Sequence, residues 1–562
     1  MSSRRLDHGT SVDKSVRVAV LLCGHLESAG SSLDVSAILR WFAEHDPEVV
    51  VHVLPRLCTR PQGLPDLLAE TGACRTVLGL CRTQYEAGAI DAQLRQAGLD
   101  PMGLETVDLG WSCARLRSPE LATGKAQILL AAAVAKARAY PGSSVENVRP
   151  RLPTRLSRRG LLRFPLLTYE AVPSISRERC VAKRGCALCV RACPYGALES
   201  KNGAIRLDKA RCRSCGLCVT ACPREAVLFP GYTGLQIDAQ VRALLDPVTG
   251  TLQPRGILFT CAHSTASVEP LHPGWMPLRL PCLAIAPPTW YLVPLGLGAS
   301  AVGVLPCPDE CHGTLAEIVR ERVQFCQDFL EAIGVPPDLI QYRPALDCPP
   351  ADRESGISLP GPEDGLPEPA FSAQPKVIAA ILLELARRCS RDRPTAFAGD
   401  ASTFPHPAAP LGIVEIDENT CTGCGLCADA CPTGALRFET TVEQATLRFE
   451  AASCVGCSEC LSICPERARG AIRVQRAIAW GRLRSGEQVV TRDLVARCVR
   501  CGTPIAPGRM LDRIMALLVD ESSGLQSTLS RYCVSCRVIA GSSEGGTDHA
   551  TQRPPEHFSS QS

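Results

Sequence analysis

The sequence predicts a multidomain protein of mixed α/β and α+β class, and three observations lead to this prediction. The chain has 562 residues, enough for about three to five domains at roughly 100–200 residues each. Apolar runs alternate with helical stretches in two separate segments, which is typical of small parallel-sheet α/β domains. Cysteine, with 32 residues, is concentrated in two short segments that repeat one another.

The amino-acid composition restricts which partners and which cellular compartment we expect for this protein. The 60 Lys and Arg residues nearly balance the 57 Asp and Glu residues, so there is no electrostatic reason to expect nucleic acid or an anionic membrane as a partner. The chain begins with polar and charged residues rather than a secretion signal, and most cysteines fall in Cys-x-x-Cys spacings. That spacing is typical of metal ligands in a reducing compartment, so we expect a cytoplasmic protein without a disulfide framework.

The stretch from Leu280 to Pro308 contains no charged residue and is longer than the ~20 residues that a membrane helix needs. It is either a membrane span or a buried strand–helix–strand. Prolines favour the buried strand–helix–strand, because they would leave backbone groups unsatisfied in lipid; they are Pro281, Pro287, Pro288, Pro294 and Pro306. We therefore expect no membrane span.

Residues 16–140 are expected to form the first α/β domain, after a disordered stretch at 1–15. Apolar runs predict buried parallel strands at Val16–Leu22, Val49–Leu54 and Thr76–Leu80. Helical patterns after the first and third of these strands predict helices at Val35–Ala43 and Ala89–Ala97, and a long Ala-rich helix is expected at 120–139.

Changes in composition divide the rest of the chain. The expected segments are a linker at 141–175, a cysteine-rich module at 176–230, a second α/β domain at 237–345, a linker at 346–375, a helix and linker at 376–410, a second cysteine-rich module at 411–476, a four-cysteine element at 490–540 and a disordered tail at 541–562. Duplication of one module is the simplest account of the repeated cysteine pattern.

The second cysteine-rich module has two runs of the pattern Cys-x-x-Cys-x-x-Cys-x-x-x-Cys-Pro, and both match the spacing of bacterial ferredoxins. Three thiolates of a run bind one [4Fe–4S] cluster, and the fourth binds the partner cluster. The alternative, zinc knuckles, would not need the third cysteine or the trailing Cys-Pro. The predicted ligand sets are Cys421, Cys424, Cys427 and Cys464 for one cluster, and Cys431, Cys454, Cys457 and Cys460 for the other.

The first module repeats this pattern with one departure. Lys183 stands where the first ligand is expected, and Cys180 lies three residues earlier. A bulge can still bring the Cys180 sulfur to the iron; the alternative is a three-iron or labile cluster with an open iron. The predicted sets are Cys180, Cys186, Cys189 and Cys222 for one cluster, and Cys193, Cys212, Cys215 and Cys218 for the other.

Four further cysteines follow the expected strands of the first domain or precede its long helix: Cys23, Cys58, Cys81 and Cys113. Parallel sheets build their sites at the carboxyl ends of strands, which makes a four-thiolate site reasonable. The pieces LLCG, LPRLCT, VLGLCRTQYE and GWSCARL, followed by Ala-Thr-Gly-Lys-Ala at 122–126, resemble the N-terminal domain of the A component of heterodisulfide reductase. This resemblance implies one [4Fe–4S] cluster in the domain.

In that family a flavin domain comes next, whereas here a linker leads directly to the first cysteine-rich module. The stretch Gly296–Gly303 does not fit a Gly-x-Gly-x-x-Gly turn, and ATGKAQ lacks the rest of a phosphate-binding loop. We expect no bound FAD or NAD in this chain, so flavin chemistry would belong to a partner protein.

Residues 255–345 resemble the iron–sulfur (delta) subunit of methyl-viologen-reducing hydrogenase, through ILFTCAHS, LRLPCLA, GASAVGVLPCPDECHG and the helical segment that follows. Ser264 replaces a further cysteine of that family. The alternative is a set of buried core thiols, since free cysteine is among the most buried residue types. The resemblance implies a [2Fe–2S] site on Cys261, Cys282, Cys307 and Cys311.

Two Cys-x-x-Cys knuckles follow the second module, Cys498 with Cys501 and Cys533 with Cys536. Their separation by a helical segment predicts a zinc-ribbon-like element with a structural zinc ion, and a further iron site is the alternative.

These patterns predict an iron–sulfur protein that relays electrons within an oxidoreductase complex resembling heterodisulfide reductase and hydrogenase assemblies. No Ser/His/Asp set, carboxylate pair or open metal site suggests a catalytic residue. Substrate conversion is therefore expected in partner subunits of flavin, heterodisulfide reductase or hydrogenase type. The alternative is an iron–sulfur redox sensor or scaffold.

Overall fold

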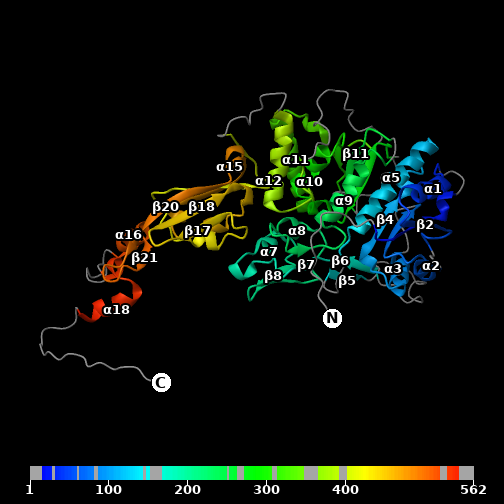
Figure 1. Cartoon of the computed structure of the whole chain (residues 1–562). Coiled ribbons are helices and arrows are strands. Elements are labelled where there is room, and N and C mark those ends of the chain that lie inside the picture. Colours follow the sequence, from blue (N-terminus) through cyan, green and yellow to red (C-terminus); the bar gives the residue numbers. More distant parts are fainter. Residues whose placement is uncertain are drawn as a thin grey trace, which may run out of the picture. The chain divides into compact units, whose positions relative to one another are not determined.

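A computed structural model of the chain is shown in Figure 1. The structure describes residues 15–27, 32–59, 63–81, 87–142, 147–151, 168–249, 252–261, 271–306, 313–346, 365–390, 402–518 and 528–543. Residues 1–14 and 544–562 of the expected disordered ends and much of the two expected linkers lie outside these residues, whereas residues 541–543 of the expected tail are helical. The chain forms two compact units. Unit 1 comprises Met1–Ile413, Glu450–Cys457 and Val474–Gly486, and unit 2 comprises Val414–Phe449, Ser458–Arg473 and Glu487–Ser562.

Unit 1 begins with a parallel four-stranded sheet of order β2-β1-β3-β4. The central strand β1 (Val18–Cys23) is buried at every position, which explains its unbroken apolar sequence. The strands beside it are β2 (Val49–Leu54), β3 (Arg75–Leu80) and β4 (Leu104–Asp108). The parallel sheet is confirmed, but β4 was not expected, because its sequence LETVD is only half buried and lacks an apolar run.

Helices cover this sheet: α1 (Val35–His45), α2 (Leu64–Thr71), α3 (Ala87–Gln96), α4 (Leu109–Ser112) and α5 (Pro119–Arg138), with short 3-10 turns η1 (Gly24–Glu27) and η2 (Pro101–Gly103). The Ala-rich helix α5 packs against the sheet and also against α9 (Gly234–Leu245), so small or apolar residues occupy most of its circumference. Ser118 caps the start of α5, where its side chain accepts a hydrogen bond from the Leu121 amide at 3.3 Å.

The first cysteine-rich module is built from short elements. Its antiparallel strand pairs are β5 (Val148–Arg151) with β6 (Thr168–Ala171), β7 (Ser174–Ile175) with β10 (Val227–Leu228), and β8 (Leu198–Lys201) with β9 (Ala204–Leu207). The turn η4 (Ala182–Arg184) and the helices α7 (Leu188–Ala192) and α8 (Leu217–Thr220) carry or adjoin the cysteine loops. Part of the expected linker therefore forms β5 and β6.

A second parallel sheet has the order β12-β11-β13-β14. Its elements are β11 (Gly256–Cys261), β12 (Trp275–Leu280), η5 (Leu283–Ile285), α10 (Pro288–Gly296), β13 (Val302–Val304), α11 (Gly313–Ala332), η7 (Pro337–Leu339) and β14 (Ile340–Tyr342). The charge-free stretch at 280–308 forms η5, α10 and β13, and every residue of α10 is buried. Across the described ranges, no helix combines the length and apolarity that a bilayer span requires.

Unit 1 also holds α12 (Pro375–Ser390), β15 (Thr403–Pro405), η9 (Ala451–Ser453) and α15 (Trp480–Arg484). In unit 2, a four-stranded sheet of order β17-β18-β20-β21 adjoins the second module. The remaining elements of the chain are β16 (Gly412–Ile416), α13 (Leu426–Asp429), β17 (Leu436–Thr440), β18 (Gln444–Glu450), α14 (Glu459–Ile463), η10 (Arg467–Arg469), β19 (Ile472–Ala479), β20 (Glu487–Arg497), β21 (Pro504–Pro507), α16 (Gly508–Leu517) and α18 (Val534–Ser543). Residues 412–413 of β16 and 474–479 of β19 are assigned to unit 1.

Substitution of either of two neighbouring arginines on α12 should reduce the stability of the fold, but to different extents. Both pair with Glu384 and hold the pKa of its carboxyl at about 2. The Arg388 side chain is 1% exposed and also donates to the Gly296 carbonyl at 2.9 Å, whereas the Arg387 side chain is 45% exposed. Arg388→Met should lower the free energy of unfolding by roughly 3 kcal/mol, because it leaves the Gly296 carbonyl without this buried donor and Glu384 with the exposed Arg387 alone of the pair. Arg387→Met should lower it by less than about 1 kcal/mol.

Urea unfolding under anaerobic conditions, followed by tryptophan fluorescence, measures both variants. Equal and small losses for the two substitutions would show that the buried arginine contributes no more than its exposed neighbour.

Candidate functional site

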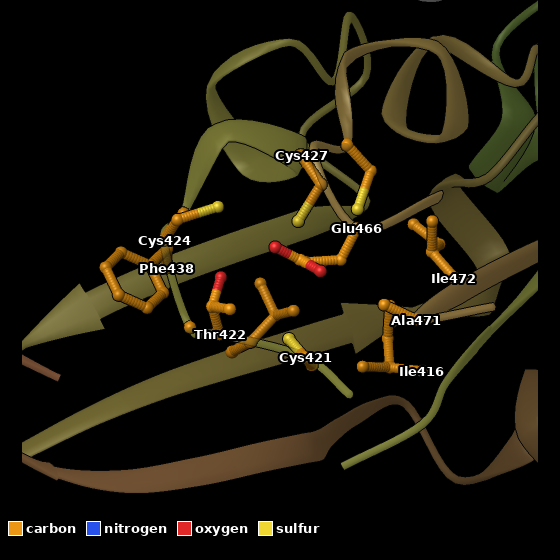
Figure 2. Close-up of a pocket in the computed structure, with 13 residues that line it drawn as sticks. Ile416, Cys421, Thr422, Cys424, Cys427, Phe438, Glu466, Ala471 and Ile472 are labelled. Carbon is orange, nitrogen blue, oxygen red and sulfur yellow. The ribbon is translucent and has the colours of Figure 1, made fainter. Parts of the chain in front are cut away.

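One predicted ligand set lines a single pocket in unit 2 (Figure 2). Two of its cysteines, Cys421 and Cys424, lie in the loop that leads into α13. Cys427 lies in α13 itself, and Cys464 follows α14. The loop requires glycine at 423 and 425, where φ is 65° and 78°. A Cβ atom at Gly425 would lie 2.6 Å from the Phe438 ring, so this glycine also allows the loop to approach β17.

The rest of the pocket wall is mainly apolar. Ile416, Phe438, Leu447 and Ile472 line it beside the four sulfurs. A [4Fe–4S] cluster needs four thiolates around a cavity that limits access of water to its sulfurs. The donor set and the apolar wall therefore fit such a cluster.

The pocket also disfavours four free thiolates without a cation. Burial and, to a smaller extent, the neighbouring thiol groups of Cys421 and Cys424 raise the pKa of Cys427 to about 12. Burial raises the pKa of Cys464 as well. Binding of iron must remove these protons, so the same crowding that keeps the thiols neutral makes the set a strong site for positive charge.

A carboxylate that the sequence analysis did not identify lines the same pocket. Figure 2 shows the Glu466 side chain directed toward the cysteine sulfurs. Its oxygens pair with Arg469 at 2.9 Å and Arg513 at 3.0 Å, and these partners, Arg469 first, lower its pKa. The two arginines thus keep a negative charge beside the cluster site and offset it.

The second predicted ligand set of this module comprises Cys431, Cys454, Cys457 and Cys460. Cys431 and Cys460 belong to unit 2, and Cys454 and Cys457 belong to the segment Glu450–Cys457 of unit 1. Cys431, Cys454 and Cys460 are buried, which suits ligands better than surface thiols.

The first module places Cys180 beside the ligands that were predicted to share its cluster. Cys180 and Cys222 pack against the same small core as Cys189. Burial raises the pKa of Cys189 to about 12, and the thiol groups of Cys222, Cys186 and Cys180 add to that effect. The displaced cysteine is therefore near the other three sulfurs despite its altered spacing.

The other set of this module is similarly crowded. Burial raises the pKa of Cys215, and the thiol groups of Cys193 and Cys212 raise it further. Cys193 comes from the first run and the other two come from the second. The exchange of the fourth ligand between runs thus agrees with where the side chains lie.

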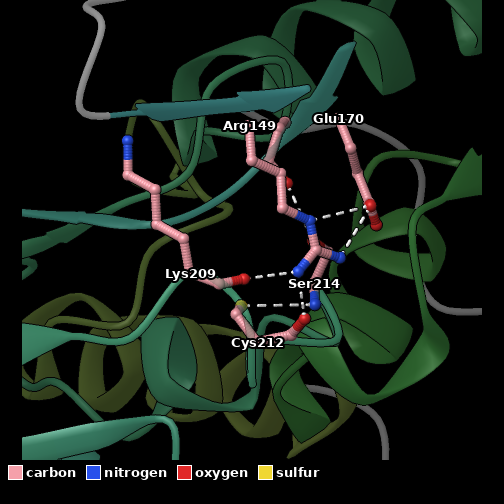
Figure 3. A network of polar contacts seen from close by, with 6 residues as sticks. Arg149, Glu170, Lys209, Cys212 and Ser214 are labelled. Carbon is pink, nitrogen blue, oxygen red and sulfur yellow. Dashed lines mark hydrogen bonds and ion pairs between the residues drawn. The ribbon is translucent and has the colours of Figure 1, made fainter. Parts of the chain in front are cut away.

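Arg149 joins the preceding strand pair to this module (Figure 3). Its guanidinium donates to the carbonyl oxygens of Lys209 and Cys212, each at 2.5 Å, and pairs with Glu170 at 2.7 Å. The Ser214 hydroxyl donates to the Ala171 carbonyl at 2.8 Å. These bonds fix the loop that carries Cys212. Sequence analysis missed this role, because Arg149 lies among other arginines in an expected linker.

Backbone amides donate to several ligand sulfurs. The amide of Ser214 lies 3.4 Å from the Cys212 sulfur, that of Ala197 lies 3.4 Å from Cys193, and that of Ala226 lies 3.3 Å from Cys222. Hydrogen bonds to the sulfurs stabilise negative charge on a cluster and are one means of setting its reduction potential.

Within unit 1, residues 372–376 connect the two modules. Glu225, three residues after Cys222, accepts hydrogen bonds from the Ser372 hydroxyl at 2.7 Å, the Ala373 amide at 3.1 Å and the Gln374 side chain at 2.9 Å. The ammonium of Lys376 pairs with Glu450 at 2.7 Å.

Glu450 in turn accepts a hydrogen bond from the Ser453 hydroxyl at 2.7 Å, directly before Cys454. Burial raises the pKa of Cys186, and the Cys457 thiol adds a small further increase. The linked segment therefore brings a cysteine of the first module within electrostatic range of a cysteine of the second.

The first α/β domain gathers a compact donor group at the carboxyl ends of its strands. It contains three of the predicted cysteines and one histidine that was not predicted: Cys23, His25, Cys58 and Cys81. Each donor atom lies within 4.8 Å of the others. Cys113 is fully buried and is not part of this group. The spacing Cys-Gly-His was the available sequence signal, but a single histidine near a cysteine is common without any metal.

Only half of the predicted [2Fe–2S] site can be placed. Cys261 ends β11, Cys282 follows β12, and these adjacent parallel strands bring both cysteines to the same sheet edge. Cys307 and Cys311 lie outside the described residues. The [2Fe–2S] site remains a prediction.

The C-terminal element gathers its four cysteines, Cys498, Cys501, Cys533 and Cys536, within 4.8 Å of one another. The Cys501 sulfur lies 3.6 Å from each of the Cys533 and Cys536 sulfurs. Hydrogen bonds from the Cys533 and Cys501 amides lower the pKa of Cys498 to about 6. The group can hold one metal ion, and the identity of that ion remains a prediction.

Comparison with known families identifies the two cysteine-rich modules. The model of the 4Fe-4S dicluster domain matches residues 179–226 and 420–468. The chain thus contains two 4Fe–4S dicluster domains, as the cysteine spacing predicted, and the first match includes Cys180. No curated protein matches the chain.

Replacing Cys180 tests whether the displaced cysteine is a ligand. Cys180→Ala should lower the iron content by at least one atom per chain and produce the EPR signal of an oxidised three-iron cluster, because one iron loses its thiolate. Cys74→Ala, at an exposed thiol, is the matched control and should leave both unchanged. Full iron content and an unchanged spectrum in Cys180→Ala would rule out this ligand.

The metal-free protein should lose thermal stability as the pH rises above about 9. The pKa values of Cys189 and Cys427 are raised from 9.0 to about 12 in the folded chain, so folding favours the thiol form. Their contribution is present below pH 9 and is lost between about 9 and 12.

Scanning calorimetry of the metal-free chain between pH 7 and 10 measures this loss. The double variant Cys189→Ser, Cys427→Ser should show a flatter profile. A wild-type Tm that does not change above pH 9 would contradict the prediction.

Proposed function

We propose that this protein relays electrons through its two dicluster modules to partner proteins. The observation that carries the proposal is the presence of two 4Fe–4S dicluster domains in one chain, joined by a hydrogen-bonded segment. Each bound cluster supplies one-electron transfer. The chain's own residues hold the ligands, shield them from water and set the local charge.

Three features support a relay over a passive store of iron. Hydrogen bonds reach individual sulfurs, a carboxylate offset by arginines adjoins one cluster site, and residues 372–376 connect the modules. These are the kinds of interaction by which proteins adjust reduction potentials and fix cluster positions. A chain that only carried iron would not need them.

The finer part of the proposal concerns the assembly. The resemblances found in the sequence support a cytoplasmic complex of heterodisulfide reductase or hydrogenase type, in which partner subunits convert the substrate. We propose a [2Fe–2S] centre in the central domain, where Cys261 and Cys282 share a sheet edge. We also propose a structural zinc ion in the C-terminal element, whose four thiolates suit tetrahedral coordination.

The relay is tested by anaerobic reduction and reoxidation of the iron-loaded chain. We expect the clusters to accept electrons from a low-potential donor and return them to a one-electron acceptor, with full retention of iron and acid-labile sulfide over repeated cycles. Loss of iron in each cycle would instead support the alternative of a redox sensor that reports by cluster loss.

Glu225→Ala tests the connection between the modules. The substitution removes the acceptor of three hydrogen bonds, so the iron content should stay constant while the Cys186 and Cys457 regions of unit 1 are held less firmly together. In EPR spectra of the fully reduced protein, broadening from spin coupling between modules should decrease. Transfer between the modules should slow at least several-fold in stopped-flow measurements.

Glu199→Ala, at an exposed position on β8 of the same module, is the control and should change neither readout. Wild-type coupling and rates in Glu225→Ala would show that the segment does not set the path between the modules.

A further inference from the structure

We propose that the first α/β domain holds a single tetrahedral metal ion of the Zn²⁺ class, with His25 as its fourth ligand in place of Cys113. The site comprises Cys23, Cys58, Cys81 and the Nδ1 atom of His25, and is independent of electron relay by the dicluster modules. It differs from the four-cysteine cluster that the resemblance implies.

The sheet order explains which residues can meet. Cys23 and His25 extend from the central strand β1, Cys58 follows β2 on one side, and Cys81 follows β3 on the other. The carboxyl ends of adjacent parallel strands lie about 4.8 Å apart. Side chains from these three strand ends can therefore converge on one point.

Cys113 is excluded by the same topology. It follows β4, which is separated from β1 by β3, and it lies one helical turn further along, after α4. Its buried surroundings include the ammonium of Lys125 on α5. Cys113 is thus a core thiol beside another helix, not a member of the donor group.

Gly24 allows the two donors of β1 to approach the loop after β2. A Cβ atom at this position would lie 2.8 Å from the Pro55 Cα and 3.3 Å from the Leu54 carbonyl oxygen. Only glycine permits this packing, which holds Cys23 and His25 on either side of the contact. The Cys-Gly-His sequence is thereby a local requirement of the site.

The distances match one ion rather than a cluster. The Cys81 sulfur lies 3.6 Å from the Cys23 sulfur and 3.5 Å from the Cys58 sulfur. The His25 Nδ1 atom lies 3.3, 3.5 and 3.8 Å from the sulfurs of Cys58, Cys23 and Cys81. Two zinc–sulfur bonds of about 2.3 Å at a tetrahedral angle place the sulfurs about 3.8 Å apart.

The other cysteine groups of the same chain can be compared with this site by the spacing of their sulfurs. The thiolates of a [4Fe–4S] cluster bind four different irons, so their sulfurs must lie farther apart than two ligands of one ion. None of the dicluster cysteine sets, all of which the structure describes, forms a group as compact as this one. The C-terminal four-cysteine group does. The N-terminal site therefore belongs with the compact, single-ion class.

The donor chemistry specifies the ion. Three thiolates and one imidazole in a closed tetrahedron favour Zn²⁺ and leave no open position for a substrate. Binding through Nδ1 leaves the proton of a neutral imidazole on Nε2. The ion would fasten the ends of β1, β2 and β3 together.

The test uses the full-length, iron-loaded chain purified anaerobically. Wild-type protein should contain two zinc ions, one at this site and one in the C-terminal element, and X-ray absorption at the zinc edge should show one nitrogen among their eight ligands. His25→Ala should lower the zinc content by one ion per chain and leave iron and acid-labile sulfide unchanged. His45→Ala, at an exposed histidine of α1, and Cys113→Ala should leave all three values unchanged.

His25→Cys gives a second readout that does not depend on loss of folding. It should keep the ion but replace its nitrogen scattering with sulfur. The proposal is overturned if Cys113→Ala lowers iron and sulfide while His25→Ala does not, since that identifies a four-cysteine cluster. Zinc scattering with sulfur ligands only in the wild type, or a disulfide among the three cysteines in the anaerobic protein, would also overturn it.

Discussion

The binding of buried thiolates to positive metal centres is the interaction on which most of this structure depends. In both dicluster modules, burial and mutual repulsion raise the pKa of the cysteine ligands, so the sites favour neutral thiols until a cation binds. Short strands and helices of four or five residues cannot provide a large hydrophobic core by themselves. Metal–sulfur bonds would replace the missing core in these modules.

The larger elements of the structure carry further cysteine sites. The parallel sheets contribute buried strands whose ends carry cysteines, and the long helices α5 and α9 pack together within unit 1. Arg149 on β5 holds the loop that carries Cys212, and residues 372–376 bond to Glu225 and Glu450, which lie near cysteine ligands. Hydrogen bonds and ion pairs from residues outside the cysteine loops thus hold the short elements of the modules in place.

Much of this could be predicted from the sequence, because ligand spacing and strand patterns are local signals. The dicluster domains and the parallel sheet followed from Cys-x-x-Cys runs and from apolar stretches such as Val49–Leu54. Glu466 and His25 could not be predicted in the same way. Their roles depend on contacts with residues that are distant in sequence, Arg513 for Glu466 and Cys58 and Cys81 for His25. Cys113 shows the opposite case: its residue type suggested a ligand, but it follows β4, one strand farther from the donor group of Cys23, His25, Cys58 and Cys81.

The ion pair between Glu466 and Arg513 gives unit 2 a thermodynamic coupling between its two metal-binding regions. Arg513 lies on α16, which packs against β20 and β21, and β21 leads back to the Cys498–Cys501 knuckle. Pro507, at the end of β21, adjoins Gly423 in the cluster loop. If release of the C-terminal ion displaces Arg513, the Glu466 charge is left less compensated and reduction of the adjacent cluster becomes harder. Reciprocity then requires that reduction of the cluster tightens the hold on an ion bound there, so occupancy of the C-terminal group would take part in setting a potential.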